Sequence, residues 1–293
     1  MAIKHKLQSS IYYILKHNKD GSYATQANRK KMLYACGNEL VENGYKLQNI
    51  KSLKRKHIIF LVEQWKIRKL SIGTIKNRLA NLRWLCEKLD KPNVIPTNDE
   101  LNIGSREFIT NKDKSIKLNH EQLNKITDEH IKLSLQLQYH FGLRREEALK
   151  IKPFISDKND FLELQGSWCK NGRPRTIPIR TNEQKQILEQ CKKLLQFKHL
   201  SMIPKNRSYK QHLKIYENQL KNAAIYHAHG LRHDYAQRRY FELTGKQCSA
   251  KCEEINIKNE IDKQARLKIS EEMGHSRIQI VANYLGSNKK AKD

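Results

Sequence analysis

The sequence predicts a mainly α-helical protein of two domains, with one small antiparallel β-hairpin confined to the second domain. Three observations lead to this prediction. The chain has 293 residues, which suits two domains that each bury a core. Apolar residues recur at helical spacing, and the pattern is interrupted over residues 90–107 by two prolines, a glycine and several asparagines. Strand-like segments occur only between residues 161 and 179.

The first domain is predicted to span residues 1–105 and to contain helices only. Helices are expected over 25–43, 54–68 and 72–89, because apolar residues fall three or four positions apart in each. Ser71 precedes the third helix and can cap it, since a serine hydroxyl accepts from a free backbone N–H. No segment of residues 1–95 has the alternation of a strand.

A linker is expected at residues 106–112, and the second domain at 113–293. Its predicted helices cover 118–142, 181–197, 209–224, 229–244 and 266–286, and its strands 161–164 and 176–179. Asn171-Gly172 is typical of a tight hairpin turn between the two strands.

Composition favours a soluble, cytoplasmic protein. Charged residues make up 30% of the chain, no apolar run approaches a membrane span, and "MAIKHKLQSS" has no signal-peptide core. The six cysteines lack pairing logic and are expected to be free thiols. A metal site at Cys248, Cys252 and the nearby histidines is the less favoured alternative, because the spacing matches no tight ligand pattern.

The net charge of +27 points to a polyanion partner. Residues 1–105 hold 20 Lys and Arg against 8 Asp and Glu, and the remainder holds 37 against 22. A lysine-rich solvated surface is the simpler alternative, but so large an excess repels itself unless an anion neutralises it. We therefore expect double-stranded DNA to contact both domains, with the protein on the nucleoid when bound. The predicted contacts are Lys76, Arg78, Arg83, Arg173 and Arg175.

Four short segments of the second domain carry candidate catalytic groups. In "HFGLRREEALKIKP" (140–153), Arg144 can direct its planar fork at an anion, with Glu147 one turn later as its support. In "CKNGRPRTIPI" (169–179), Lys170 stands at the hairpin tip. "HAHGLRHDYAQRRY" (227–240) places His229 and Arg232 on one helix face, and "GHSRIQIVANYLG" (274–286) contributes His275 and Tyr284. Each segment alone has an ordinary structural explanation.

Together these groups suit phosphoryl transfer without a metal. The chain has no glycine-rich nucleotide loop and no acidic cluster ready to hold Mg²⁺. Arginine and lysine side chains can hold phosphate oxygens and neutralise charge in the transition state. A tyrosine can then attack phosphorus and form a covalent ester.

The order of these segments resembles that of the tyrosine recombinases, the phage-integrase family. "GLRREEAL", "KNGRPRTIP", "HGLRH" and "MGHSRIQIVANYL" are similar to the family's successive boxes, with His275 and Tyr284 at the family spacing of nine. The resemblance covers about 113–293 and implies a catalytic domain there, with a helical core-binding domain before it. It implies Tyr284 as the nucleophile, Arg144, Arg232 and His275 at the phosphate, Lys170 as the acid and His229 as the base. It also implies no cofactor, metal or ATP, a homotetramer on two DNA sites, and room for an accessory directionality factor.

Two departures and three alternatives accompany this interpretation. Residues 245–265 lengthen the interval between Arg232 and His275 and are expected to form a polar surface excursion, and only nine residues follow Tyr284. A type IB topoisomerase uses related chemistry, but it would relax DNA without a defined site. A non-catalytic DNA-binding regulator would explain the charge but not the order of the reactive groups. A metal-dependent nuclease would need an acidic cluster.

Overall fold

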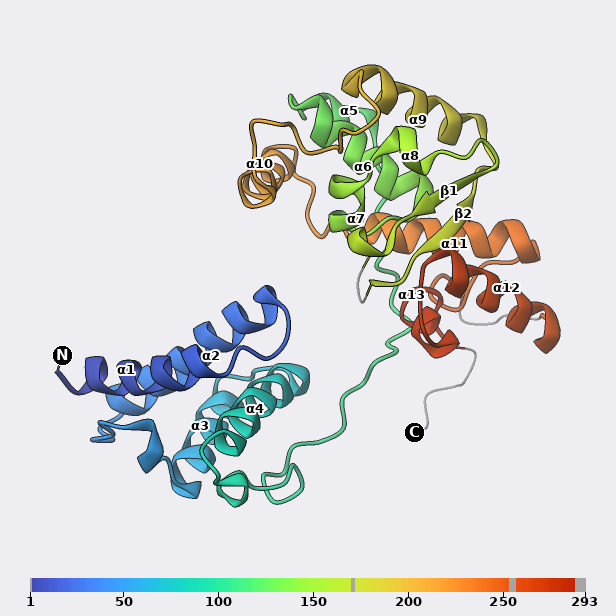
Figure 1. Ribbon diagram of the computed structural model, residues 1–293. Helices are drawn as coiled ribbons and strands as arrows, with labels where there is room; N and C mark the ends of the chain where they lie inside the picture. The colour runs from blue at the N-terminus through green and yellow to red at the C-terminus, as the bar shows by residue number, and fades with distance from the viewer. Residues whose placement is uncertain (1, 170–171, 253–256, 288–293) are drawn as a thin grey trace. The chain divides into compact units, whose positions relative to one another are not determined.

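The computed structural model describes residues 2–169, 172–252 and 257–287 and divides into two compact units, Met1–Glu107 and Phe108–Asp293. Helices dominate both units, and the second also holds a two-stranded antiparallel sheet (Figure 1). The predicted fold class is therefore confirmed. Within the described residues, no helix combines the length and the apolar character needed to cross a membrane.

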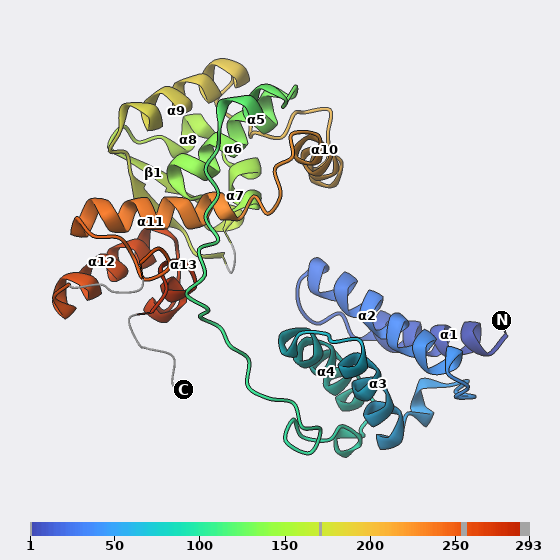
Figure 2. The ribbon, with the colours of Figure 1, turned by 180° about the vertical axis from the view of Figure 1, so that it is seen from behind.

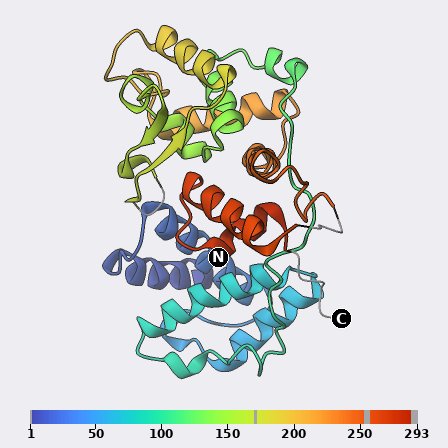
Figure 3. The ribbon, with the colours of Figure 1, turned by 90° about the vertical axis from the view of Figure 1, so that its right-hand side faces the viewer.

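The first unit is a small bundle of four helices, drawn in blue and cyan in Figure 3. These are α1 (Ala2–His17), α2 (Tyr23–Glu42), α3 (Arg55–Ile67) and α4 (Ile72–Glu87), with single 3₁₀ turns at Ile50–Ser52 and Pro92–Val94. Helix α2 packs against α1, α3 and α4, and the core between them includes Leu7, Leu33, Leu40, Leu61, Trp65 and Leu79. The hydroxyl of Ser71 accepts from the backbone N–H of Thr74 at 3.2 Å, which confirms the predicted cap.

Helix α1 was not among the predicted elements, although its sequence contains the helical signal. Leu7, Ile11 and Ile14 lie four and three positions apart and are all buried. This spacing places them on one face, which packs against α2.

The second unit holds the remaining elements. Its longer helices are α6 (Glu129–Phe141), α9 (Asn182–Leu195), α10 (Tyr209–Asn222), α11 (Gly230–Thr244) and α12 (Asn259–Glu272). Its short helices are α5 (His120–Asn124), α7 (Arg145–Lys150), α8 (Pro153–Ser156) and α13 (Ala282–Leu285), with 3₁₀ turns at Gly166–Trp168 and Ile278–Val281. Strands β1 (Phe161–Leu164) and β2 (Arg175–Pro178) pair antiparallel, with Leu162 opposite Ile177.

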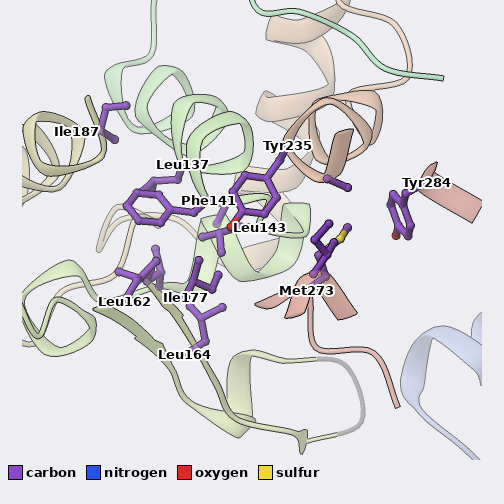
Figure 4. Close-up of a cluster of buried hydrophobic side chains, with 14 of the residues drawn as sticks. Leu137, Phe141, Leu143, Leu162, Leu164, Ile177, Ile187, Tyr235, Met273 and Tyr284 are labelled. Carbon is purple, nitrogen blue, oxygen red and sulfur yellow. The ribbon is translucent and has the colours of Figure 1, made fainter. Parts of the chain in front are cut away.

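The main core of this unit lies between α6, α11 and the inner face of the sheet (Figure 4). Leu162, Leu164 and Ile177 alternate inward along the two strands and are fully buried, as period-two strand geometry requires. Phe141 and Tyr235 fill the space above them, and Tyr284 lies at the margin of the same cluster. The core therefore fixes α6 and β2 together with α11, and the candidate site lies at the start of α11.

An extended segment, residues 108–119, opens the second unit and is called the strap below. Figure 2 shows it crossing α11 and passing beside α13. The backbone N–H of Ile116 donates to the carbonyl of Gly230 at 3.1 Å, which fastens the strap to the start of α11. A Cβ on Gly230 would lie 2.5 Å from Ile116, so the close crossing requires glycine there.

Two predicted helices are wrong in extent. The helix expected over 118–142 is interrupted between α5 and α6, because Asp128 begins a new helix by accepting from the N–H of Ile131. The helix expected over 266–286 ends at Glu272, since Gly274 adopts a left-handed φ of +64° that a helix cannot continue through. The chain then re-forms only the 3₁₀ turn and α13.

The two strands agree with their predicted bounds to within one residue, since β1 ends at Leu164 and Arg175 begins β2. Asn171 of the predicted turn lies outside the described residues. The structure corrects the prediction for residues 245–265. Part of the expected surface excursion is buried: Cys248 is 1% and Ala250 9% exposed, and Asn259 already begins α12. This correction arises from tertiary packing that local polarity does not reveal.

Candidate active site

The candidate site is assembled at the ends of helices in the second unit. Arg144 immediately precedes α7, and His229 immediately precedes α11, on whose first turn Arg232 lies. His275 follows α12 after the left-handed Gly274, and Tyr284 belongs to α13. Helix starts suit this task, because the first backbone N–H groups of a helix have no partner within the helix and can bind an anion.

Glu147 connects two arginines beneath the site. Its carboxylate accepts from the backbone N–H of Arg144 at 2.7 Å and from the Arg144 guanidinium at 2.8 Å. It also accepts two hydrogen bonds from Arg175, at 2.9 and 2.7 Å. Glu147 is 1% exposed, whereas the Arg144 side chain is 23% exposed. Glu147 therefore fixes the position of Arg144, while part of the Arg144 side chain stays exposed to solvent.

The charge state of Glu147 follows from these neighbours. Burial by itself would raise the pKa of this carboxyl, but hydrogen bonds and charge from Arg175, with the charges of Arg232 and Arg144, lower it to about 2. Glu147 is therefore ionised at neutral pH and offsets part of the positive charge collected here.

Arg232 is fixed by backbone carbonyls rather than by a carboxylate. Its guanidinium donates to the carbonyls of Gly142 and Met273, and one of its nitrogens lies 3.3 Å from Nε2 of His275. The side chain is almost completely buried, and its Nε has no acceptor among the described residues. Burial, followed by the charges of neighbouring arginines, lowers the pKa of Arg232 to about 10, so it keeps its charge at neutral pH.

Tyr284 lies among three histidine rings. Its hydroxyl is 3.2 Å from Nε2 of His229. The ring of His275 stacks on it at 5.3 Å between centroids, and the ring of His233 lies at 4.5 Å. The guanidinium carbon of Arg232 is 5.8 Å from the centre of the Tyr284 ring. The phenol is 7% exposed and is thus enclosed beside a fixed cation.

The histidines around Tyr284 favour their neutral forms. Burial and then the charge of Arg232 lower the pKa of His275 to about 3, and burial with the nearby His229 lowers that of His233 to about 4. Desolvation and the charges of Arg232 and Arg144 also lower the pKa of His229, although this residue is exposed and water screens part of the effect. A neutral imidazole has a free nitrogen that can accept a proton.

Five of the six predicted catalytic residues, together with Glu147, therefore lie at one place. Lys170 lies outside the described residues, in the connection between the two strands. Arg173 is exposed in the same connection. The prediction that Arg175 contacts DNA is corrected, because its guanidinium is buried and bonded to Glu147 and to the carbonyl of Glu272.

The other predicted DNA contacts lie on α4 of the first unit. Lys76, Arg78 and Arg83 are all partly buried. Arg78 lies over the ring of Trp65, and Arg83 donates to Asn98 at 3.0 Å. Two of the three thus have partners within their own unit, and their role at DNA stays a prediction.

The sequence alone did not single out His233, Gln237 or Asn111. His233 contacts the Tyr284 ring, Gln237 donates to the backbone carbonyl of Tyr284 at 3.2 Å, and Asn111 is bonded to Ser287. One signal was available for the first two: His233 and Gln237 are four positions apart, on one face of α11. Nothing local marks Asn111, because its partner lies at the other end of the unit.

The structure gives no support to the metal alternative. In the part of the chain that it describes, no three His, Cys, Asp or Glu side chains are grouped so that they could hold a metal ion. Burial raises the pKa of the Cys248 thiol, which disfavours the thiolate form that binds metals.

The chain matches two family models in succession. Residues 5–93 match the phage integrase N-terminal domain, and residues 100–238 match the integrase domain. No curated protein sequence matches the chain.

Solved structures share its fold at low sequence identity. They include a lambda integrase (75–356) dimer bound to a COC′ core site, at 14% identity and a TM-score of 0.60, covering 98% of this chain and 97% of that one. A lambda integrase tetramer bound to a Holliday junction matches at 14% identity and 0.59, covering 97% and 78%. The XerH site-specific recombinase bound to difH matches at 17% and 0.57, covering 96% and 81%. The successive matches to the phage integrase N-terminal domain and to the integrase domain show that this chain belongs to the phage integrases, the tyrosine recombinase family.

Proposed function

We propose that this protein cuts and rejoins double-stranded DNA at a defined site through a covalent 3′-phosphotyrosyl intermediate formed by Tyr284. The observation that carries the proposal is the position of the Tyr284 hydroxyl, 3.2 Å from a ring nitrogen of His229 and beside the buried cation Arg232. A nucleophile within hydrogen-bond reach of a base, next to a fixed positive charge, is the arrangement that phosphoryl transfer requires.

Arg144 and Arg232 would hold the non-bridging oxygens of the scissile phosphate. Arg144 is held by Glu147 yet partly open, and the buried Nε of Arg232 has no acceptor in the described ranges. The Nδ1 atom of His275 is likewise buried without a hydrogen-bond partner there. A phosphate group would supply acceptors to donors of this kind, and these cations would neutralise the charge that develops in the transition state.

The chemical step balances without a cofactor. The Tyr284 oxygen attacks phosphorus while its proton passes to His229, and the bond from phosphorus to the 5′-oxygen breaks. Lys170 donates a proton to that oxygen, which leaves as a 5′-hydroxyl. One phosphodiester bond is exchanged for another, so no ATP is consumed. A 5′-hydroxyl from a second duplex then reverses the step and completes strand exchange. The cationic side chains take the place that a metal ion occupies in other phosphoryl transfers.

Both units would contact the DNA. We propose residues 1–105 as a core-binding domain, residues 106–112 as the linker and residues 113–293 as the catalytic domain. The positive excess of both parts supports this assignment, since each phosphate contact releases counterions and adds affinity. A homotetramer on two DNA sites is the proposed active assembly, and the lambda integrase tetramer on a Holliday junction supports it. An accessory protein that sets the direction of recombination is compatible with this assembly.

The test is covalent capture of DNA. The full-length protein is incubated with duplexes of randomised sequence, the reaction is stopped with detergent, and protein-bound strands are recovered, amplified and selected again. The duplex that emerges, called the selected duplex below, should become attached through its 3′-phosphate, in the presence of EDTA. Tyr284→Phe removes only the hydroxyl, so it should bind the selected duplex with unchanged affinity and form no covalent complex.

Three results would contradict the proposal. A covalent complex that persists in Tyr284→Phe would exclude Tyr284 as the nucleophile. Cleavage that is lost in EDTA and restored by Mg²⁺ alone would indicate a metal-dependent nuclease. Relaxation of supercoiled plasmids that lack the selected sequence would indicate a topoisomerase.

A further inference from the structure

The backbone that carries Tyr284 is held by contacts from outside its own helix. Helix α13 has four residues, which is too short to be stable by itself. Gln237 donates to the carbonyl of Tyr284 at 3.2 Å, and the N–H of Ala250 donates to the carbonyl of Leu285 at 2.9 Å. Arg266 donates to the carbonyl of Gly286 at 2.8 Å. The position of the phenol therefore depends on these external partners.

The strap supplies a further external partner through Asn111. Its side-chain oxygen accepts from the N–H of Ser287 at 2.9 Å, and its side-chain nitrogen donates to the carbonyl of Ser287 at 3.1 Å. One amide thus satisfies both backbone groups of one residue, as a neighbouring β-strand would. We call this two-bond contact the strap clasp.

Asn111 is suited to this position by its backbone as well as its side chain. Its φ is +48°, in the left-handed region that asparagine tolerates better than most residues. Asn111 also lies close to the backbone of Gly286. A Cβ on that glycine would lie 2.9 Å from the side-chain oxygen of Asn111 and 2.8 Å from the backbone nitrogen of Ala250. The chain crosses so tightly that only glycine fits at residue 286.

The strap also contacts the peptide group of Tyr284 indirectly, through Gln237 of α11. The side-chain nitrogen of Gln237 that contacts the Tyr284 carbonyl also donates to Asp113 at 2.9 Å. Asp113 in turn accepts from the N–H and the hydroxyl of Ser115. The strap therefore holds residues 284–287, called the tyrosine segment below, at two points: directly at Ser287, and through Gln237 at Tyr284.

We propose that Asn111 is a positioning residue for the cleavage reaction, and that the strap clasp keeps the Tyr284 hydroxyl at His229 and in reach of the phosphate. This inference rests on the proposed function. Asn111 itself lies outside the group of reacting side chains and acts through the backbone of the tyrosine segment. Because reaction rates fall steeply when a nucleophile is displaced by about an ångström, loss of the clasp should slow cleavage by roughly 10- to 100-fold.

The main variant is Asn111→Gly, which removes the amide and keeps the left-handed backbone accessible. Asn159→Gly is the matched control, because Asn159 is an exposed asparagine of the same unit with a φ of +70°. The measurements are the single-turnover rate of covalent-complex formation on the selected duplex and the dissociation constant for that duplex. We expect a slower rate with an unchanged dissociation constant for Asn111→Gly, and neither change for Asn159→Gly.

Two further measurements separate positioning from a general loss of structure. With sulfur in place of the bridging 5′-oxygen the leaving group needs no proton, and the Asn111→Gly defect should persist because the nucleophile is still displaced. Asn111→Asp keeps the acceptor for Ser287 N–H and should cleave at an intermediate rate. Recovery of Asn111→Gly on the sulfur substrate, or a rate equal to that of the unaltered chain, would overturn the proposal.

Hydrogen exchange tests the clasp without any DNA. The amide of Ser287 should exchange faster in Asn111→Gly than in the unaltered chain or in Asn159→Gly, and unchanged exchange would overturn the clasp itself. If the unaltered chain forms no covalent complex with any duplex, the proposed function fails. The exchange result then decides by itself whether Asn111 holds the tyrosine segment.

Discussion

Replacing Glu147 by glutamine tests whether one buried carboxylate organises the cations of the site. Glutamine keeps the shape of the side chain and one acceptor oxygen, but it removes the charge that faces Arg144 and Arg175. The pKa of Glu147 falls from its ordinary 4.5 to about 2 on folding, which corresponds to about 3 kcal/mol of stability at neutral pH. Removing one partner of a buried ion pair costs about 3–5 kcal/mol, which agrees with this value.

The sign of the pH dependence is fixed by the direction of the pKa change. A carboxyl with a lowered pKa in the folded state stabilises the protein fully above pH 4.5, and this contribution is lost as the pH falls from 4.5 toward 2. The free energy of unfolding of Glu147→Gln should thus lie about 3 kcal/mol below that of the unaltered protein at pH 7. The difference should shrink steadily below pH 4.5.

Urea denaturation followed by circular dichroism, at pH 7 and at two values below 4.5, measures this difference. Glu146→Gln is the matched control: its carboxylate pairs with Lys150 and is 53% exposed, so its loss should cost less than about 1 kcal/mol at any pH. Cleavage by Glu147→Gln should also slow, since Arg144 loses the group that orients it. A stability difference that stays constant from pH 7 to pH 3 would refute an ionised Glu147 as the organising charge.

Gly274→Ala should destabilise the protein by about 1–3 kcal/mol, because φ is +64° and the new Cβ would lie 2.7 Å from the Arg175 side chain. Thermal unfolding measures this effect, and an unchanged melting temperature would contradict it. His233→Gln should flatten the pH dependence of stability between pH 6.5 and 4. Burial lowers the pKa of His233 to about 4, so its contribution is complete above 6.5 and is lost as the pH falls through this range; equal slopes in urea titrations would refute the prediction. Lys170→Ala should cleave the selected duplex very slowly and recover when sulfur replaces the bridging 5′-oxygen, whereas Arg144→Ala should stay slow on both substrates; failure of sulfur to rescue Lys170→Ala would exclude it as the acid.

The sequence by itself determined the class of the fold and the order of the reactive groups. Local sequence predicted the helical periodicity, the cap at Ser71 and the strand at 161–164, because each depends on residues only a few positions apart. The family resemblance was likewise carried by short boxes, in which Arg144 and Glu147 are three positions apart. Such boxes could nominate residues for the site but not say how they meet.

Only the tertiary structure distinguished the arginine that is buried in an ion pair from the arginine that is exposed to solvent. Arg173 lies in the connection between the strands and is exposed, whereas Arg175, two residues later, begins β2 and is buried against Glu147, 28 positions away. The burial of Cys248 within the supposed surface excursion is a second case, since its polar neighbours gave no sign of it.

The same reason explains why Asn111 was invisible in the sequence. Its partner Ser287 lies 176 positions away, and the two meet only because the strap crosses α11 beside the segment that carries Tyr284. A local pattern reports what a residue can do within its own helix or turn. Which distant backbone group it contacts is set by the way the strap and α13 pack against α11.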